Sequence, residues 1–295
     1  MTPAETHETK RILIVDDDPG IHRLLSATLN DSSRSIESAY DGLEGLRKFQ
    51  NANWDLVITD VTMDGIDGMD LLERINRICP RTPVIVMTAD TTADRIVSAI
   101  RGNAFSWLRK PFVMQVVREI VDNALTAPRL ENDIEILSAS PRWLELRLRC
   151  NIETATRVLH FVRELDTGLP EADQEKIALA FREILFNAVE HGGRCDAGQW
   201  VTVAYMRGDS ALLFRVRDPG PGFSFDKLRH AATSNPSDSP AEHTMKRDQL
   251  GLRPGGFGIL LARSLVDELI YNDKGNEALL IKYLERKEKE KGAAA

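Results

Sequence analysis

Acidic side chains follow two apolar runs in the first half of the sequence. Asp16 and Asp17 come directly after one run, and Asp60 ends another. Short apolar runs predict buried strands, and parallel strands bring their carboxyl ends to one edge of a sheet. Carboxylate oxygens are the ligands that Mg²⁺ prefers in proteins. The three aspartates therefore predict a magnesium site at this edge.

A hydroxyl and a lysine follow two further apolar runs. Thr88 ends one of them, and Lys110 comes shortly after Trp107. A carboxylate that attacks phosphorus needs the charge of the phosphoryl group neutralised, and Lys110 could supply part of that beside the metal. Thr88 could then donate its hydroxyl to a phosphoryl oxygen and move towards Asp60. The cavity that it leaves would admit Trp107, which couples a local charge to a surface change.

Each of these residues alone has an ordinary explanation. An aspartate at a strand end is most often a turn residue or a helix cap, and a lysine before proline is usually solvated. The set argues against that explanation, because the acids, the hydroxyl and the lysine occur together in the order that one sheet edge requires.

Three polar residues recur at every fourth position in the second half. Glu183, Asn187 and His191 would lie on one face of an apolar helix predicted over residues 171–190, which ends at the Gly192–Gly193 pair. An asparagine oxygen offers Mg²⁺ a neutral ligand, and a glutamate can act as a base or orient a water. A solvated polar stripe is the more usual explanation of such a spacing unless other motifs support a site.

Two glycine motifs supply that support. Asp218 follows a predicted strand, where its carboxylate could accept a hydrogen bond from an exocyclic amine while glycines let the backbone approach a flat base. A second motif opens the next predicted helix, and glycine N–H groups at a helix N-terminus suit phosphates. Neither motif is a Walker loop or a Rossmann fingerprint. The glycines are Gly220, Gly222, Gly255, Gly256 and Gly258.

The order of predicted elements differs between the two halves. In the first, strands at residues 11–15, 35–39, 56–59, 84–88 and 107–108 alternate with helices at 21–29, 43–50, 69–78, 95–100 and 114–125. This alternation predicts a doubly wound parallel sheet. In the second, strands are predicted at 143–150, 200–205, 212–217 and 278–283, with a helical stretch to residue 165 and a helix at 257–269. The polar stretch 223–254 predicts a lid.

Prolines and small residues indicate where the domain boundaries are expected. Pro128 and the stretch Ser138–Pro141 place a linker between the two halves. The expected parts are a first domain at 9–126, a linker at 127–141, a second domain at 142–286 and a charged tail at 287–295.

The composition is that of an ordinary globular protein, with 42% hydrophobic and 28% charged residues. A length of 295 residues favours two domains, and a net charge of −7 argues against a nucleic-acid partner. Cys79, Cys150 and Cys195 lack metal-ligand spacing and fit a reducing compartment. No apolar run approaches the ~18 residues of a membrane span, and the N-terminus does not look like a signal peptide. A cytoplasmic protein is expected.

The first domain resembles the receiver domains of bacterial response regulators over about residues 10–126. The family implies that an upstream histidine kinase phosphorylates Asp60. It implies that Mg²⁺ is held by Asp17, Asp60 and the backbone of Thr62, and that Asp16 helps through water. The resemblance rests on Val15-Asp16-Asp17, Asp60, Asp67-Gly68, Thr88-Ala89 and Lys110-Pro111-Phe112.

The receiver family also implies that Thr88 and Trp107 form a switch pair, with Lys110 beside them. One departure is visible, since Asp64 follows Met63 where the family usually has proline. This change could alter the rigidity of the loop or the lifetime of the acyl phosphate, but it removes no reacting group.

The second half resembles the ATPase family shared by histidine kinases, gyrase and a heat-shock chaperone, whose fold is a GHKL or Bergerat α/β sandwich with a mixed sheet. It is most similar to the anti-sigma-factor serine kinases, over about residues 142–285, through the phrases at 182–192 and 263–268. The family implies Asn187 on Mg²⁺, Glu183 as the general base towards a Ser/Thr hydroxyl, and Asp218 on adenine. The residues implied in ATP binding are Asn187, His191, Asp218, Gly220, Gly222, Gly255, Gly256 and Gly258.

Other members of that family fit less well. A hybrid histidine kinase needs a phosphorylated histidine in a helical hairpin, and the candidate His160 is followed by Phe161 instead of an acid. A gyrase or a chaperone would need a transducer after residue 285.

Two hypotheses follow. The first is a response regulator whose output domain is an ATP-dependent serine/threonine kinase acting on a small anti-sigma antagonist of the STAS type. The second is a phosphorylation-controlled module that holds ATP and sequesters a sigma factor or another partner with little turnover. Glu183 favours the enzyme. A monomer and a homodimer are equally compatible with the composition.

Overall fold

The computed structural model describes residues 9–89, 93–126, 133–165, 167–223 and 258–284. The chain divides into two compact units, which are treated separately. Unit 1 comprises residues 1–133 and 156–165, and unit 2 comprises residues 134–155 and 166–295. Among the described residues, no helix combines the length and the apolar character needed to cross a bilayer.

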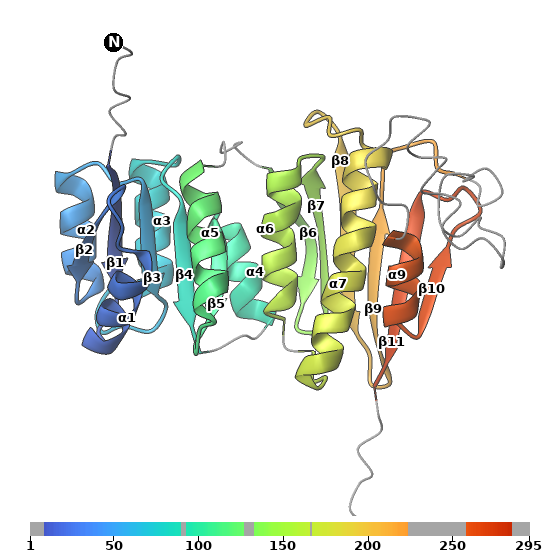
Figure 1. Ribbon diagram of the computed structural model, residues 1–295, viewed down its shortest axis with the longest axis horizontal. Helices are drawn as coiled ribbons and strands as arrows, with labels where there is room; N and C mark the ends of the chain where they lie inside the picture. The colour runs from blue at the N-terminus through green and yellow to red at the C-terminus, as the bar shows by residue number, and fades with distance from the viewer. Residues whose placement is uncertain (1–8, 90–92, 127–132, 166, 224–257, 285–295) are drawn as a thin grey trace, which may run out of the picture. The chain divides into compact units, whose positions relative to one another are not determined.

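The strands of unit 1 are β1 Lys10–Val15, β2 Arg34–Ala39, β3 Leu56–Asp60, β4 Val84–Thr88 and β5 Ser106–Arg109. They form one sheet in the order β2-β1-β3-β4-β5, and every pairing is parallel (Figure 1). The inner strands β3 and β4 are buried along their whole length, as uninterrupted apolar runs predict. The predicted parallel sheet is therefore confirmed, and β2 and β5 are its edge strands.

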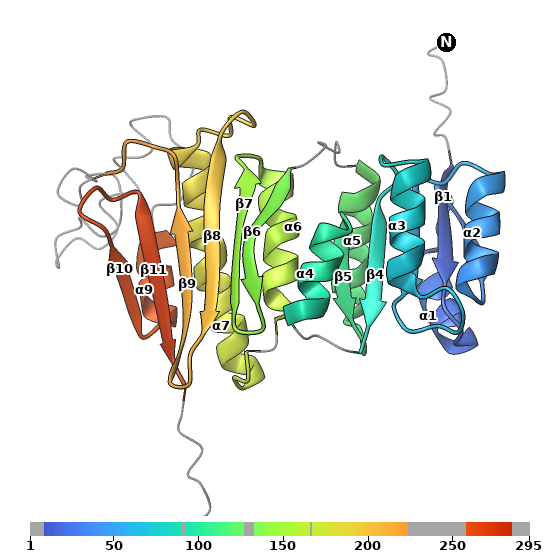
Figure 2. The ribbon, with the colours of Figure 1, turned by 180° about the vertical axis from the view of Figure 1, so that it is seen from behind.

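The helices of unit 1 that follow these strands are α1 Pro19–Leu29, α2 Gly42–Asn51, α3 Gly68–Ile78, α4 Ala93–Arg101 and α5 Met114–Thr126. α1 and α5 cover one face of the sheet, and α2, α3 and α4 cover the other (Figures 1 and 2). Aspartates begin three of them: Asp18, Asp41 and Asp67 each accept a hydrogen bond from a backbone N–H in the first turn.

A continuous apolar core fixes the sheet against α1 and α5. Ile14, Ile58 and Met87 on the strands and Val117 and Ile120 on α5 are almost completely buried in it. Burial of such a side chain contributes about 1.5–3 kcal/mol each. The ends of β1 and β3, where the predicted aspartates stand, are therefore held by well-packed elements.

The strands of unit 2 are β6 Ile134–Ser140, β7 Trp143–Arg149, β8 Trp200–Arg207, β9 Ala211–Arg217, β10 Glu268–Tyr271 and β11 Glu277–Tyr283. They form a sheet in the order β10-β11-β9-β8-β7-β6. All pairings among the described strands are antiparallel, so the expected mixed sheet is wrong in this respect. Two helices in succession separate β7 from β8. The first helix runs back along the sheet and the second returns to the end where β7 finished, so β8 starts there and runs antiparallel to β7. A single helix would have given a parallel neighbour.

The helices after β7 are α6 Ile152–Arg163, α7 Glu171–Asn187, the π-helical turn η1 Ala188–Gly192, and α9 Gly258–Leu265. α7 and α9 lie side by side on one face of the sheet of unit 2 (Figures 1 and 2). This layered arrangement confirms the predicted α/β fold. The helix predicted over 257–269 is too long, because the last of its residues belong to β10, which pairs with β11.

The predicted linker at 127–141 is wrong over residues 134–140. Residues 134–140 form β6, which pairs with β7 as an edge strand of unit 2. A register shift between Ile136 and Ser138 interrupts the alternation of apolar and polar residues in this strand. This irregularity and the small residues near Ser138 explain why the sequence suggested a loop. Residues 127–132, the predicted lid at 223–254 apart from Phe223, and the predicted tail at 287–295 lie outside the described residues.

Glu164, just after α6, should make stability depend on pH. Burial raises the pKa of this carboxyl from 4.5 to about 7, although Arg109 and Arg163 oppose the rise. The folded state therefore holds the proton more tightly, so this stabilisation is full below pH 4.5 and is lost as the pH rises through about 7. Because Glu164 is partly accessible to solvent, the expected loss in the free energy of unfolding is about 2 kcal/mol.

Urea unfolding at pH 5 and pH 8 tests this expectation. Between the two pH values, the free energy of unfolding of Glu164→Gln should fall by about 2 kcal/mol less than that of the parent protein. Glu153→Gln, which changes an exposed glutamate on the same helix, should keep the parent's pH dependence. Equal pH dependence in Glu164→Gln and the parent would contradict the assignment.

Candidate functional sites

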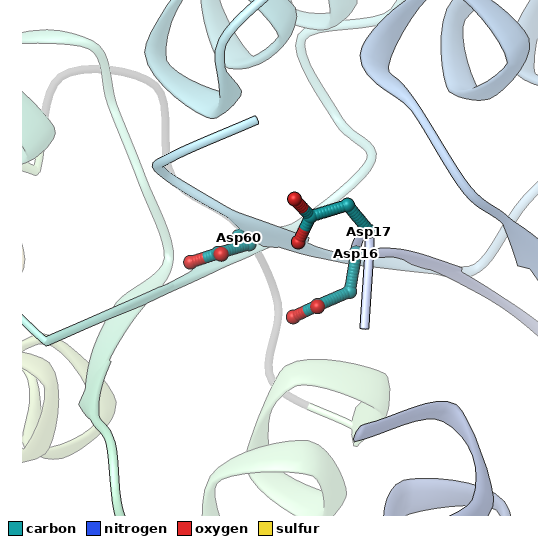
Figure 3. A group of neighbouring side chains, drawn as sticks. All are labelled: Asp16, Asp17 and Asp60. Carbon is teal, nitrogen blue, oxygen red and sulfur yellow. The ribbon is translucent and has the colours of Figure 1, made fainter. Parts of the chain in front are cut away.

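The three predicted aspartates lie together at the carboxyl edge of the unit 1 sheet. β1 and β3 are neighbours with Val15 opposite Thr59, so the residues that follow each of them stand side by side. One oxygen from each of Asp16, Asp17 and Asp60 lies within 4.8 Å of the others. Figure 3 shows their carboxylates directed to the same side of the strands. Asp16 and Asp60 are buried and Asp17 is exposed, so the cluster opens to solvent on one side.

Lys110 forms ion pairs with the two buried aspartates of the cluster. Its Nζ lies 2.8 Å from Asp16 Oδ2 and 3.0 Å from Asp60 Oδ2. Burial raises the pKa of Asp60 above its ordinary value, although the hydrogen bond and the charge of Lys110 oppose the rise. Burial lowers the pKa of Lys110, but its bonds to Asp16 and Asp60 outweigh this and leave the pKa above its ordinary value. Lys110 is therefore a fixed positive charge beside Asp60.

Local backbone contacts hold these carboxylates in place. Asp16 Oδ1 accepts a hydrogen bond from the N–H of Asp18, and the ring of His22 bonds to the carbonyl oxygen of Asp16 at 2.8 Å. The first turn of α3 presses against Asp60, since a Cβ at Gly68 would lie 1.9 Å from the carbonyl oxygen of Asp60. Only glycine fits at that position. Asp18 itself is a helix cap, the ordinary role of such an aspartate.

The aspartate cluster fits a magnesium ion. Ligand oxygens of octahedral Mg²⁺ lie about 3–4 Å from one another, and one oxygen from each aspartate lies within 4.8 Å of the others, so the cluster is compact enough for one ion. The sequence places Thr62 two residues after Asp60, and its side chain is exposed. Mg²⁺ would be held by the aspartates and would neutralise part of the charge of a phosphoryl group at Asp60.

Thr88 and Trp107 lie on the same face of the unit 1 sheet. Trp107 pairs with Val86 across β4 and β5, so Thr88, two residues further on, is its diagonal neighbour. Trp107 is completely buried in this structure, whereas the sequence led us to expect that it enters only after Thr88 moves. Its indole N–H has no hydrogen-bond acceptor among the described residues. Burial of an unpaired donor costs about 1–3 kcal/mol.

In unit 2, the structure brings Glu183 and Asn187 together at the beginning of α9. Both side chains come from the last two turns of α7. A Cβ at Gly258 would lie 2.8 Å from Glu183 Oε2 and 3.6 Å from Asn187 Nδ2. Arg182 also donates to Glu183 Oε1 at 2.9 Å. The first residue of α9 therefore lies against the two polar side chains that the sequence selected.

The helix that carries these residues widens directly after Asn187. η1 continues α7 with π-helical bonding, in which the N–H of Gly193 donates to Ala188 at 2.8 Å. Such turns are rare in proteins, and those that occur are often found at functional sites. Gly193 is the C-cap of this turn, so the helix ends at the glycine pair as the sequence predicts, and the left-handed residues are Arg194 and Cys195, which follow it with φ values of 55° and 53°. His191 is exposed in η1 and no longer follows the four-residue spacing of a regular α-helix.

Asp218 begins the loop after β9 and packs against η1. A Cβ at Gly192 would lie 2.3 Å from Asp218 Cγ, so the backbone of η1 approaches the carboxyl closely. Asp218 Oδ1 accepts from the N–H of Gly220 at 2.7 Å. Burial raises the pKa of Asp218, although the Gly220 bond and the charge of Lys274 oppose this. The carboxyl is thus a half-buried acceptor in a backbone-lined site.

The turn before β11 completes the wall of this site. The side-chain amide of Asn276 donates to the carbonyl oxygen of Asp218 at 3.1 Å, and the N–H of Asp218 donates to the carbonyl oxygen of Asn276. Gly222 has a φ of 79°, and a Cβ there would lie 1.9 Å from the carbonyl oxygen of Lys274. Both features require glycine. Sequence reasoning missed Asn276, because no local motif marks it.

These residues fit a nucleotide. The backbone-lined carboxyl of Asp218 suits an exocyclic amine, while Asn187 and Glu183 lie where α9 begins. Asn187 could hold Mg²⁺ and so place charge beside phosphates. Gly255 and Gly256, which the sequence assigned to the phosphates, lie outside the described residues.

Comparisons with known families agree with the two units. Residues 12–122 match the response regulator receiver domain, and residues 148–282 match the histidine kinase-like ATPase domain. The chain therefore carries a response regulator receiver domain followed by a histidine-kinase-like ATPase domain.

Curated relatives match about half of the chain. The chain is 37% identical over 145 residues to the transcriptional regulatory protein GlrR of Escherichia coli (strain K12), which covers 48% of this chain and 33% of that protein. It is 34% identical over 143 residues to the response regulator protein PilR of Pseudomonas aeruginosa, which covers 47% and 32%. The chain thus spans about a third of the length of these curated relatives. A response regulator receiver domain protein from Clostridium thermocellum is 33% identical, with a TM-score of 0.38, and covers 39% of this chain and 94% of that chain.

Proposed function

We propose that this protein is a two-component response regulator whose phosphorylation at Asp60 controls an ATP-dependent serine/threonine kinase. The observation that supports the first part best is the contact of Lys110 with both Asp16 and Asp60 beside an open acidic cluster. The observation that supports the second part is the meeting of Glu183, Asn187 and the first residue of α9. The setting that fits both is the bacterial cytoplasm.

At the first site, an Asp60 carboxylate oxygen would attack the phosphorus of a phosphohistidine on an upstream kinase. A P–O bond forms as the P–N bond breaks, and the histidine nitrogen leaves with the electron pair. Lys110 would keep its contact with Asp16 and bind a phosphoryl oxygen, so that charge is balanced without a proton transfer. Thr88 lies on the neighbouring strand end and would donate its hydroxyl to another phosphoryl oxygen.

At the second site, Glu183 would accept the proton of a substrate Ser/Thr hydroxyl. That oxygen forms a bond to the γ-phosphorus of ATP as the bond between the γ-phosphorus and the β–γ bridging oxygen breaks, and ADP leaves. Catalysis then consists of positioning and charge neutralisation, to which Asn187 contributes by holding Mg²⁺. The substrate that fits is a small anti-sigma antagonist of the STAS type.

A sequestering module is the alternative. The same pocket could hold ATP while the protein binds a sigma factor or another partner with little turnover. Glu183 favours the kinase, because a side chain that can accept a proton is not needed for holding the nucleotide alone.

Transfer of label from γ-labelled ATP to a purified STAS-type antagonist tests the proposal. The parent protein should label the antagonist, and Asn187→Ala should lose both transfer and most ATP binding. Asn53→Ala, at an exposed position of unit 1, serves as the matched control and should behave as the parent does. ATP binding without transfer to any antagonist would favour sequestration. No ATP binding by the parent would contradict both functions.

A further inference from the structure

α6 connects the two units through its own length. Its residues up to Ala155 belong to unit 2, and residues 156–165 pack in unit 1. One charged side chain of the helix is buried in unit 1: Arg157 is 5% exposed. No local sequence motif marks this arginine.

Every side of the Arg157 guanidinium is occupied in unit 1. Nη1 lies 2.5 Å from Asp133 Oδ2, and Asp133 is also buried. Nε donates to the carbonyl oxygen of Phe105 at 3.1 Å, and Nη2 donates to that of Ala104 at 3.2 Å. The guanidinium carbon lies 5.1 Å from the centre of the Phe105 ring. A planar, forked group makes this set of bonds, and the ammonium of lysine cannot.

The backbone that Arg157 holds leads directly into β5. Ala104 and Phe105 precede the strand, Trp107 lies within it, and Lys110 follows it. β5 is one of the two edge strands of the sheet and has no strand beyond it in unit 1 among the described residues. Lys110 also contacts Asp60. A displacement of Lys110 towards a phosphoryl group on Asp60 therefore acts on the strand whose beginning is fixed to α6.

A charge interaction occurs near the other ends of α6 and β5. Glu164 lies close enough to Arg109 for their charges to interact.

We propose that α6, held by Arg157 to the backbone before β5, transmits the phosphorylation state of Asp60 to the nucleotide site of unit 2. This inference rests on the proposed function, since it assigns the route by which that site is regulated. A buried ion pair by itself adds little net stability, but it fixes one geometry. Arg157 is therefore a positioning residue, and the helix that it orients continues into unit 2 through residues 152–155.

The test measures the affinity of the full chain for a fluorescent ATP analogue with and without acetyl phosphate. In the parent protein the two dissociation constants should differ by about fivefold or more, the usual range of allosteric coupling. In Arg157→Lys their ratio should approach one, while labelling of Asp60 and analogue binding persist. Arg11→Lys is the matched control, because Arg11 also pairs with an acid, Glu37, and lies 4.5 Å over an aromatic ring, that of Trp54. It should keep the parent's ratio.

The outcomes separate this proposal from the proposed function. If the parent does not bind the analogue or is not labelled, the proposed function fails. If the parent does both but its ratio is one, the regulated output and the α6 route both fail. A parent ratio retained in Arg157→Lys overturns the α6 route alone. Should Arg157→Lys not fold, Glu164→Gln decides: a ratio at least twofold closer to one supports the route, and the parent's ratio overturns it.

Discussion

Asp60→Asn should abolish labelling of the protein by acetyl phosphate. The substitution keeps the shape of the side chain and leaves an oxygen for Lys110, but the amide does not attack phosphorus. In the parent protein a P–O bond forms at Asp60 as acetate leaves with its electron pair. Labelling of the variant should fall to the level of a sample without donor, measured by phosphate-affinity gel or intact mass.

The structure supplies a control and a check on folding for the Asp60 variant. Asp70→Ala removes an exposed carboxylate in the first turn of α3 and should be labelled as the parent is. Asp60→Asn should unfold in urea no earlier than the parent, because burial disfavours the charged form of Asp60. Label that persists in Asp60→Asn would show that another residue accepts the phosphoryl group.

Glu183→Gln should reduce phosphotransfer to an antagonist by about 10²–10⁴-fold and leave ATP binding nearly unchanged. The loss follows from the proton that Glu183 would accept, whereas the amide fills the same space beside Gly258. Transfer is measured with γ-labelled ATP under single turnover, and binding with a fluorescent analogue.

Glu175→Gln is the matched control for this change, since Glu175 is an exposed glutamate two turns earlier on α7. It should transfer phosphate at the parent's rate. Parent-like transfer by Glu183→Gln would remove Glu183 from catalysis while leaving the nucleotide site intact. Loss of ATP binding in Glu183→Gln would instead show that this side chain mainly shapes the pocket.

Much of unit 1 could be predicted because its strands are short, uninterrupted apolar runs. Asp16 and Asp60 follow adjacent parallel strands, so their proximity follows from sheet order alone. The bond between Lys110 and Asp16 was not expected, since the sequence suggested only a role towards a phosphoryl group. That bond depends on how the segment after β5 turns back over the sheet edge, which no local pattern specifies.

Unit 2 was harder to predict where tertiary pairing decides the structure. Residues 268–271 continue an apolar pattern that also suits a helix, and only the partner strand β11 makes them a strand. The bulge in β6 hid an edge strand in the same way. Asn276 and Arg157 act through contacts with residues more than 20 positions away, so their roles were not readable from neighbouring residues.

The π-helical turn after Asn187 has a consequence for protein engineering. A turn of this kind holds one residue more than an α-helical turn of the same height. Removing a single residue between Ala188 and Gly192 would let regular α-helix continue and would rotate everything downstream relative to Glu183 and Asn187. In chimeras that join this segment to another ATPase domain, the number of residues in the segment must therefore be kept, even where its side chains are changed.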